Sequence, residues 1–242
     1  MTTRREFLVM AGGAAGWMAC AAKNGCATAV QARVPGTLDH ILLGCSDLER
    51  GIAFVEEKTE VRAAFGGVHP GRGTQNALLS LGERRYLEII ALDPKQESRM
   101  DPIATYLAKL DEPRLVTWAA HPRSVSELAQ RLAKEKVAAK GPTPGSRQRP
   151  DGKVLHWSTV NLEDNLNGLL PFFIEWSAES VHPSADSPKG CKLVSFVAES
   201  PEPEILEAKF RAIGIEMYVE RGENEILRAK FAGPKGMFDV TS

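Results

Sequence analysis

Cysteine is scarce in this sequence. There are four cysteines in 242 residues, and two of them, Cys20 and Cys26, fall in an N-terminal segment with the character of a removable signal. The remaining pair, Cys45 and Cys191, lacks Cys-x-x-Cys spacing. Two isolated cysteines exclude a disulfide framework, although a single bridge between them in an oxidising compartment stays open.

The sequence also lacks an excess of charge of one sign and any long apolar run. The formal net charge is −1 and the pI is about 6.5, which gives no indication of binding to nucleic acid or to an anionic membrane. No stretch is apolar for long enough to form a stable membrane span. The glycine-rich segment 66–74 has no Gly-Lys-Ser/Thr, so a Walker A loop is excluded. Neither nucleic acid nor a membrane is therefore an expected partner.

The first residues carry an export pattern. Thr3-Arg4-Arg5-Glu6-Phe7-Leu8 matches the twin-arginine consensus, and a mildly apolar run rich in glycine and alanine follows. Residues 1–32 are thus predicted to be a twin-arginine signal peptide, with cleavage after Ala29 or Ala32. This predicts recognition by the twin-arginine export machinery and a periplasmic or secreted mature protein.

Signals for the start of a helix recur along the rest of the chain. Ser46 and Ser124 each open a Ser-x-x-Glu capping box, and Ser200 is followed by Pro201. Each signal follows an apolar strand pattern and precedes apolar residues at helical spacing. Helices are therefore expected at three equivalent places.

The strand that closes each segment carries an acid between apolar residues. These acids are Glu88, Glu175 and Asp239. Caps and closing acids that repeat together indicate duplicated βαβββ units. The predicted units are 36–112, 113–190 and a shorter third unit, 191–242.

Two segments are predicted to be irregular. In the first unit the second strand is expected at 61–65, and 66–74 is expected to be a glycine-rich loop. In the second unit 141–151 is rich in proline and glycine and is expected to hold at most a short edge strand.

His40 and Glu88 are polar groups in the middle of apolar strands. Side chains alternate faces along a strand, so His40 shares a face with Leu38 and Leu42. A buried charge is costly unless it is paired or binds a metal. The pair is therefore either a buried ion pair or half of a metal site, and Glu175, as a second carboxylate, favours the metal.

The pattern resembles the vicinal oxygen chelate superfamily, especially its glyoxalase-like group. The resemblance rests on residues 38–41, 66–78 and 86–88, and extends over roughly 38–177. It implies an α+β fold in which repeated βαβββ units of the glyoxalase and dihydroxybiphenyl dioxygenase type pair into a U-shaped sheet cavity. In that superfamily the cavity holds a divalent metal.

The resemblance also implies a set of metal ligands. His40, Glu88 and Glu175 match the family positions, but Thr117 or Trp118 stands where a second His or Glu is expected. Either an extra water completes the site, or His156 supplies the fourth ligand, or this branch binds no metal. The divalent metal would be Zn, Ni, Mn or Fe.

The first functional hypothesis is a metal-dependent lyase or isomerase that acts on a small α-keto or hydroxy substrate through an enediolate-type intermediate. The carboxylates and the histidine assigned to proton transfer are Glu88, Glu175 and His156. The residues assigned to substrate binding are His69, Arg72, Asn76 and Trp118. The loop that carries His69 and Arg72 either presents backbone amides and an arginine to a substrate carboxylate or is an ordinary β-turn connection.

Two alternatives use the same cavity. His40, His156 and one glutamate form a two-His, one-carboxylate set, which suits an Fe(II) extradiol-type dioxygenase. A non-catalytic, drug-sequestering protein would use the cavity for binding alone, lined by Trp118, Phe173 and Trp176. The third unit is expected either to cover the sheet or to recruit a second chain, which would give a homodimer.

Overall fold

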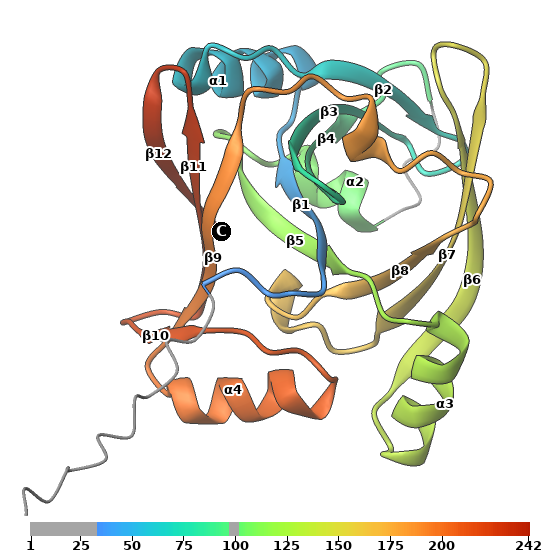
Figure 1. Cartoon of the computed structure of the whole chain (residues 1–242), viewed down its shortest axis with the longest axis vertical. Coiled ribbons are helices and arrows are strands. Elements are labelled where there is room, and N and C mark those ends of the chain that lie inside the picture. The colour runs from blue at the N-terminus through green and yellow to red at the C-terminus, as the bar shows by residue number, and fades with distance from the viewer. Residues whose placement is uncertain (1–32, 97–101) are drawn as a thin grey trace, which may run out of the picture. The chain divides into compact units, whose positions relative to one another are not determined.

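The structure, a computed structural model, describes residues 33–96 and 102–242 (Figure 1). The predicted signal peptide, 1–32, lies outside the described residues. Among the helices of the described part, none is long and apolar enough to cross a membrane.

Two βαβββ units form one eight-stranded sheet. The elements of the first are β1 (Leu38–Gly44), α1 (Leu48–Thr59), β2 (Ala64–His69), β3 (Thr74–Gly82) and β4 (Arg85–Leu92). The elements of the second are β5 (Arg114–Ala120), α3 (Val125–Lys134), β6 (Ala139–Gln148), β7 (Val154–Leu162) and β8 (Phe172–Trp176). The strand order is β2-β3-β4-β1-β5-β8-β7-β6. In each unit the opening strand pairs in parallel with the closing strand, and antiparallel pairing of β1 with β5 joins the halves. This confirms the predicted architecture.

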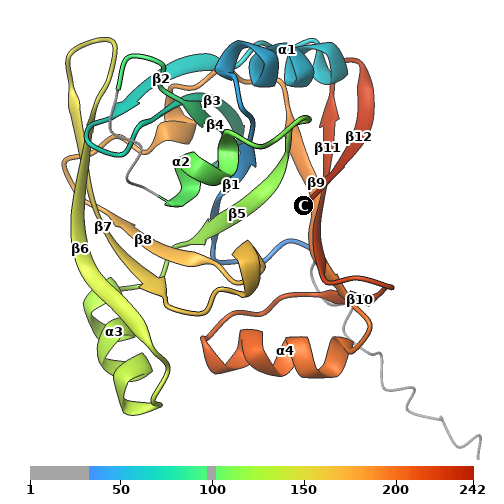
Figure 2. The same ribbon diagram turned by 180° about the vertical axis from the view of Figure 1, so that it is seen from behind.

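The sheet curves strongly, and the short helix α2 (Pro102–Leu107), which connects the units, lies on its concave side (Figure 2). The outer face is covered by α1, α3 and the last segment of the chain. Leu48, Ile52 and Val55 of α1 are buried in the main core at helical spacing, as the sequence pattern predicted.

The third segment has the predicted order of elements but a different sheet. Its elements are β9 (Lys192–Ser200), α4 (Pro203–Ala212), β10 (Val219–Arg221), β11 (Ile226–Gly233) and β12 (Gly236–Thr241). They form a separate four-stranded sheet of order β10-β9-β11-β12. The opening strand β9 therefore pairs with β10 and β11, whereas in the first two units the opening strand pairs with the closing strand.

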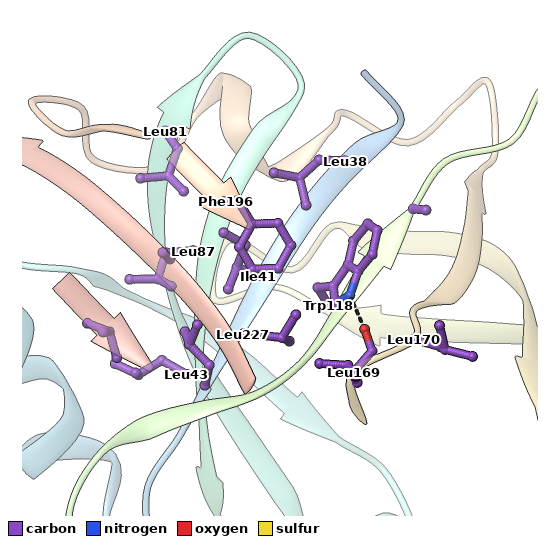
Figure 3. Close-up of a cluster of buried hydrophobic side chains, with 14 of the residues drawn as sticks. Leu38, Ile41, Leu43, Leu81, Leu87, Trp118, Leu169, Leu170, Phe196 and Leu227 are labelled. Atoms are coloured by element: carbon purple, nitrogen blue, oxygen red, sulfur yellow. Dashed lines mark hydrogen bonds between the residues drawn. The ribbon is translucent and has the colours of Figure 1, made fainter. Parts of the chain in front are cut away.

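The second sheet packs against the outer face of the first. Trp118 of β5 is fully buried and meets Phe196 of β9 edge-on, with the ring centroids 5.3 Å apart (Figure 3). The Trp118 Nε1–H donates to the carbonyl of Leu169 at 2.9 Å, which satisfies its one polar atom (Figure 3). The largest core of the molecule therefore lies on the side of the sheet away from its concave face.

The helix caps differ in detail from the prediction. Ser124 caps α3 as expected, but Asp47, one residue after Ser46, caps α1 by accepting from the Arg50 N–H. Helix α4 begins at Pro203, two residues later than expected. An aspartate competes well with a neighbouring serine for this position, because both side chains accept from the first free amides of a helix.

The two edge strands differ from the prediction: β2 spans 64–69 in place of 61–65, and β6 is longer than the short strand expected. Strand β2 continues through Gly66 to His69, so the connecting loop is only 70–73, and β6 spans ten residues despite Pro142 and Pro144. Proline is tolerated in β6 because the strand has a partner, β7, on one side only. A β-carbon on Gly67 (φ 140°) would stand 2.6 Å from the Gln148 carbonyl oxygen, so the two sheet edges approach closely here.

Cys45 and Cys191 are buried free thiols and form no bridge. Burial raises the pKa of the Cys45 thiol to about 12. Both cysteines are therefore ordinary small core residues here.

Candidate functional site

A cavity of about 640 Å³ lies on the concave side of the eight-stranded sheet. Both units contribute to its wall, and α2 contributes Ile103 and Tyr106. The volume suits a small organic molecule, because ligand pockets typically measure about 300–1,000 Å³.

His40 and Glu88 meet in this cavity, as their positions on β1 and β4 predicted. The two strands are parallel neighbours, and His40 lies opposite Tyr86, one side-chain step from Glu88. The His40 Nε2 atom is 3.5 Å from Glu88 Oε2. Both residues are buried but still line the cavity, so a ligand can reach them.

Asp39 holds the His40 ring from behind. Its carboxylate accepts from His40 Nδ1 at 2.7 Å, from His182 Nε2 at 3.2 Å and from Trp176 Nε1 at 3.3 Å. A register shift in the β1–β5 pairing at Asp39 turns its side chain to the same side as the histidine. Because Asp39 occupies Nδ1, the His40 nitrogen that faces the cavity is Nε2.

The charge of Asp39 is fixed by these contacts. Burial alone would raise the pKa of this carboxyl, but the hydrogen bonds and positive charges of His182 and His40 lower it well below its usual range. Asp39 is therefore ionised at neutral pH.

Glu88 is a buried carboxylate surrounded by donors. Asn76 Nδ2 donates to Glu88 Oε1 at 2.8 Å, and His69 Nε2 lies 3.8 Å from the same oxygen. Burial acts to raise the pKa of Glu88, but His40, His69, Asn76 and Arg147 together lower it. Glu88 is therefore ionised at neutral pH although it is nearly inaccessible to bulk water.

Arg147 reaches this cluster from the other unit. It lies on edge strand β6, and its Nη1 donates to Asn76 Oδ1 at 3.2 Å. Asn76 thus connects the Glu88 carboxylate to the Arg147 guanidinium through one amide group.

Tyr86 adds a neutral hydroxyl to the cavity. Its ring stacks on the His40 imidazole with centroids 4.4 Å apart. Burial, and then the charges of Glu88 and Asp39, raise the pKa of the Tyr86 phenol well above its usual value. The hydroxyl therefore keeps its proton and is available as a donor to a ligand.

One end of the cavity is apolar. Leu42 and Ile90, one side-chain step beyond His40 and Glu88 on the same strands, form a small buried cluster with Leu107 of α2. Val116 and Phe172 pack against this cluster. The site therefore joins a polar, charged end to an apolar end.

The glycine-rich loop is a compact turn whose backbone amides are already used. The N–H groups of Gly71 and Gly73 both donate to Gln96 Oε1. The side chains of His69 and Arg72 nevertheless line the cavity, together with Asn76. The three residues assigned to substrate binding in the first unit are thus brought together.

Glu175 is not part of this site. On β8 the residues that line the cavity are Phe172, Ile174 and Trp176, so Glu175 points to the opposite face. Its carboxylate accepts from the Val125 N–H at 2.8 Å, at the start of α3. The prediction that Glu175 joins His40 and Glu88 is corrected: it caps a helix, where a negative charge is stabilising.

His156 and Trp118 also lie elsewhere. His156 is exposed on β7, where Trp157 and Thr159 face the cavity in its place. Trp118 is in the main core, and its neighbour Thr117 lines the cavity. Both assignments are corrected. Because His156 lies outside the cavity, the set of two histidines and one carboxylate that the dioxygenase hypothesis required is not assembled there.

Comparison with known proteins agrees with this geometry. The model of the glyoxalase-like domain matches residues 38–214. The chain belongs to the glyoxalase-like domain family. This confirms the predicted membership of the vicinal oxygen chelate superfamily. No curated protein matches the sequence.

Solved structures resemble this glyoxalase-like domain at low sequence identity. A hypothetical protein from Staphylococcus aureus has 15% identity and a TM-score of 0.58, with 78% of this chain and 87% of that chain covered. Methylmalonyl-CoA epimerase from Mycobacterium tuberculosis has 18% identity and a TM-score of 0.42, covering 61% and 90%. The Streptomyces coelicolor methylmalonyl-CoA epimerase has 19% identity and a TM-score of 0.43, covering 63% and 99%. The first of these supports the fold and nothing finer.

The donors of this glyoxalase-like domain do not fit the metal site that the resemblance implied. Of the four implied ligands, only His40 and Glu88 face the cavity. His69 is a third nearby donor, but it and His40 approach opposite oxygens of Glu88. Within residues 33–96 and 102–242, no group of three or more His, Cys, Asp or Glu side chains is arranged to hold a metal ion.

Sequence reasoning missed four residues of the site: Asp39, Tyr86, Arg147 and His182. Tyr86 left a signal, because alternation along its strand places it on the same face as Glu88. Asp39 left a signal, because two consecutive polar residues in an apolar strand break its alternation and indicate a bulge. Arg147 lies in a segment whose proline and glycine content concealed a strand. His182 had the sequence character of a loop residue beside Pro183.

Proposed function

We propose that this glyoxalase-like protein is an isomerase-type or lyase-type enzyme that moves a proton at a carbon next to a carbonyl group. The observation that carries the proposal is the buried, ionised Glu88 on the cavity wall, held by Asn76 and faced by His40. A fixed carboxylate in a cavity of small-molecule size is suited to act as a general base.

In the proposed reaction Glu88 takes the proton from the substrate carbon, and negative charge develops on the adjacent carbonyl oxygen. The Tyr86 hydroxyl, kept protonated by its surroundings, and the His40 and His69 rings are the candidate groups to stabilise that oxygen. Return of a proton from Glu88 to the same carbon re-forms the substrate and is seen as exchange with solvent. In a substrate with a hydroxyl on that carbon, return of the proton to the former carbonyl carbon, with transfer of the hydroxyl proton to the former carbonyl oxygen, completes an isomerisation. Every step uses side chains that line the cavity.

The test is proton exchange. Wild-type protein in D₂O, with chelator present, should incorporate deuterium at C3 of pyruvate or phenylpyruvate faster than buffer alone, as followed by proton NMR. Glu88→Gln keeps the shape and loses the base, and we expect exchange to fall by about 10²–10⁴-fold. Glu175→Gln is the matched control, because it makes the same change on the closing strand of the other unit, outside the cavity, and should keep the rate.

The pH profile of exchange supplies a second readout. Because the pKa of Glu88 lies below its usual value, the base should stay ionised through neutral and mildly acidic pH. The exchange rate should fall only in acid, as the carboxylate becomes protonated. Exchange abolished by chelator and restored by Zn²⁺, Ni²⁺ or Mn²⁺ would refute this metal-free form of the proposal.

A second candidate function is binding without catalysis. It is favoured by the five aromatic rings of tyrosine, tryptophan and phenylalanine that line the cavity, those of Tyr86, Tyr106, Trp157, Phe172 and Trp176. Tight binding by both wild type and Glu88→Gln, with no exchange above buffer in either, would favour this candidate over the enzyme.

A further inference from the structure

Arg147 is a buried cation without a carboxylate partner. The residue is 3% exposed, and Nη1 donates to the amide oxygen of Asn76. Among the residues that the structure describes, no carboxylate lies within ion-pair distance of the guanidinium. A guanidinium has five N–H donors, and a buried charge is costly unless it is paired.

The position of Arg147 shows where a partner would come from. It lines the cavity from the edge of the second unit, while the base lines it from the first. The Asn76 amide is the link between them, donating to Glu88 and accepting from Arg147. A ligand anion at Arg147 therefore lies beside the base, at the polar end of the cavity.

We propose, building on the proposed function, that the substrate carries a carboxylate that pairs with Arg147 and an apolar arm that packs on Leu42, Ile90 and Val116. The substrate class is thus a 2-oxo or 2-hydroxy acid with an aromatic or branched side chain. A carboxylate suits a guanidinium because two parallel N–H donors match its two oxygens. The apolar cluster one side-chain step along β1 and β4 suits the arm.

Binding of such an anion also strengthens the base. The positive charge of Arg147 is one of the influences that lower the pKa of Glu88, together with His40, His69 and the Asn76 hydrogen bond. A carboxylate paired with Arg147 offsets that charge and adds a negative charge near Glu88. The carboxyl then holds a proton more tightly, so it takes one from carbon more readily.

A purely structural role for Arg147 makes different predictions. In that role its hydrogen bond, from edge strand β6 to Asn76 of β3, serves only to hold the two ends of the sheet together. A structural tie should leave carboxylate affinity unchanged when it is removed and should lower the melting temperature. An anion receptor should instead lose carboxylate affinity when its charge is removed. Because the positive charge of Arg147 also favours the ionised Glu88, affinity and not melting temperature separates the two roles.

The experiment measures binding and melting without turnover. The probes are phenylpyruvate, its methyl ester, which lacks the charge, and pyruvate, which lacks the arm. Wild-type protein should bind phenylpyruvate at least tenfold more tightly than either of the other two by calorimetry. Arg147→Met should weaken phenylpyruvate binding at least thirtyfold and bind the ester unchanged. Arg147→Lys keeps the charge but loses the two parallel N–H donors, and its affinity for phenylpyruvate should lie between those of wild type and Arg147→Met.

Lys140→Met is the matched control. It removes one positive charge from the same strand, but its ammonium is exposed and pairs only distantly with Glu163, at 3.8 Å. This variant should bind phenylpyruvate like wild type. Equal binding by wild type and Arg147→Met, a lowered melting temperature with unchanged affinity, or failure of wild type to prefer phenylpyruvate would each overturn the inference.

The result is independent of the proposed reaction. Glu88→Gln should bind phenylpyruvate at least as tightly as wild type, because it removes a negative charge near the bound carboxylate. Normal binding with no exchange would refute the reaction and leave the carboxylate site standing. Exchange on an uncharged ketone such as phenylacetone, with no preference for acids, would refute the carboxylate site and leave the reaction standing.

Discussion

At the scale of single residues, Asp39 organises the site through hydrogen bonds to three side chains. It is fully buried and accepts hydrogen bonds from β1, from β8 and from the segment that follows β8. Asp39 can accept from all three partners because both of its carboxylate oxygens are acceptors. An asparagine at this position would offer only one acceptor oxygen and would introduce an N–H donor, so His40 would lose its orientation. The arrangement of the site therefore rests on a residue that a ligand does not touch.

Replacement of Asp39 by asparagine should cost about 3 kcal/mol of unfolding free energy near neutral pH, as expected when a buried ion pair loses one partner. Because folding lowers the pKa of Asp39, its stabilising effect is present above the pKa of the unfolded chain and is lost as pH falls. The difference between wild type and Asp39→Asn should therefore shrink below about pH 4. Urea denaturation from pH 3 to pH 7 measures this.

Asp239→Asn provides the comparison for that experiment. Asp239 is a surface residue that pairs with Lys230 at 3.7 Å, so its loss should cost less than about 1 kcal/mol at any pH. Equal effects of the two substitutions, or an Asp39→Asn effect that does not depend on pH, would refute the assignment.

At the scale of elements, the closing strands show what the sequence could and could not predict. The order of strands and helices, the duplication, and the meeting of His40 with Glu88 follow from periodicity and helix caps. The error at Glu175 concerns the face of the strand: its neighbours Ile174 and Trp176 line the cavity, and Glu175 points to the other side of the sheet. Alternation shows which residues share a face, but where both faces are buried it does not show which face lines the cavity. Glu88 faces inward and Glu175 outward, although their sequence surroundings are alike.

Arg147 was beyond prediction for a related reason. An edge strand that contains Pro142 and Pro144 has the composition of a loop, and its pairing with β7 is a tertiary contact that local sequence does not record. The approach of β6 to β2 is likewise a property of sheet curvature.

That approach can be tested at Gly67. Its φ of 140° is unfavourable for other residues, and an added β-carbon would stand 2.6 Å from the Gln148 carbonyl oxygen. Gly67→Ala should therefore push the sheet edges apart. Gly71→Ala is the control, because Gly71 also has a positive φ, of 74°, but has open space around it.

We expect Gly67→Ala to destabilise the protein by about 1–3 kcal/mol more than Gly71→Ala, the usual cost of overpacking. Chemical denaturation of both variants measures the difference. If the two substitutions cost the same, backbone strain explains both and the edges are not in tight contact.

At the scale of the whole molecule, two units share one sheet and a third segment covers its outer face. The predicted homodimer and the predicted export are not tested by this arrangement and stay proposals. Of the two, export makes the sharper prediction, because it depends on two adjacent residues, Arg4 and Arg5.

Full-length protein expressed in a bacterium with a twin-arginine system should appear in the periplasmic fraction, shortened at its N-terminus. Replacing Arg4 and Arg5 together by lysine should retain the uncleaved chain in the cytoplasm, whereas Lys23→Arg should be exported normally. Fractionation and intact-mass measurement decide the matter. Equal periplasmic yield from the double variant would show that the pattern is fortuitous.

The pairing of β1 with β5 has a consequence for how such a protein can change over evolutionary time. His40, Glu88, Asn76 and Tyr86 all belong to the first βαβββ unit, whereas the second unit supplies Arg147 and the walls that shape the cavity: Thr117, Trp157, Phe172 and Ile174. Selection can thus remodel the second unit to admit new molecules while the first is left intact. A library of variants confined to that half is the natural starting point for altering which compounds the protein accepts.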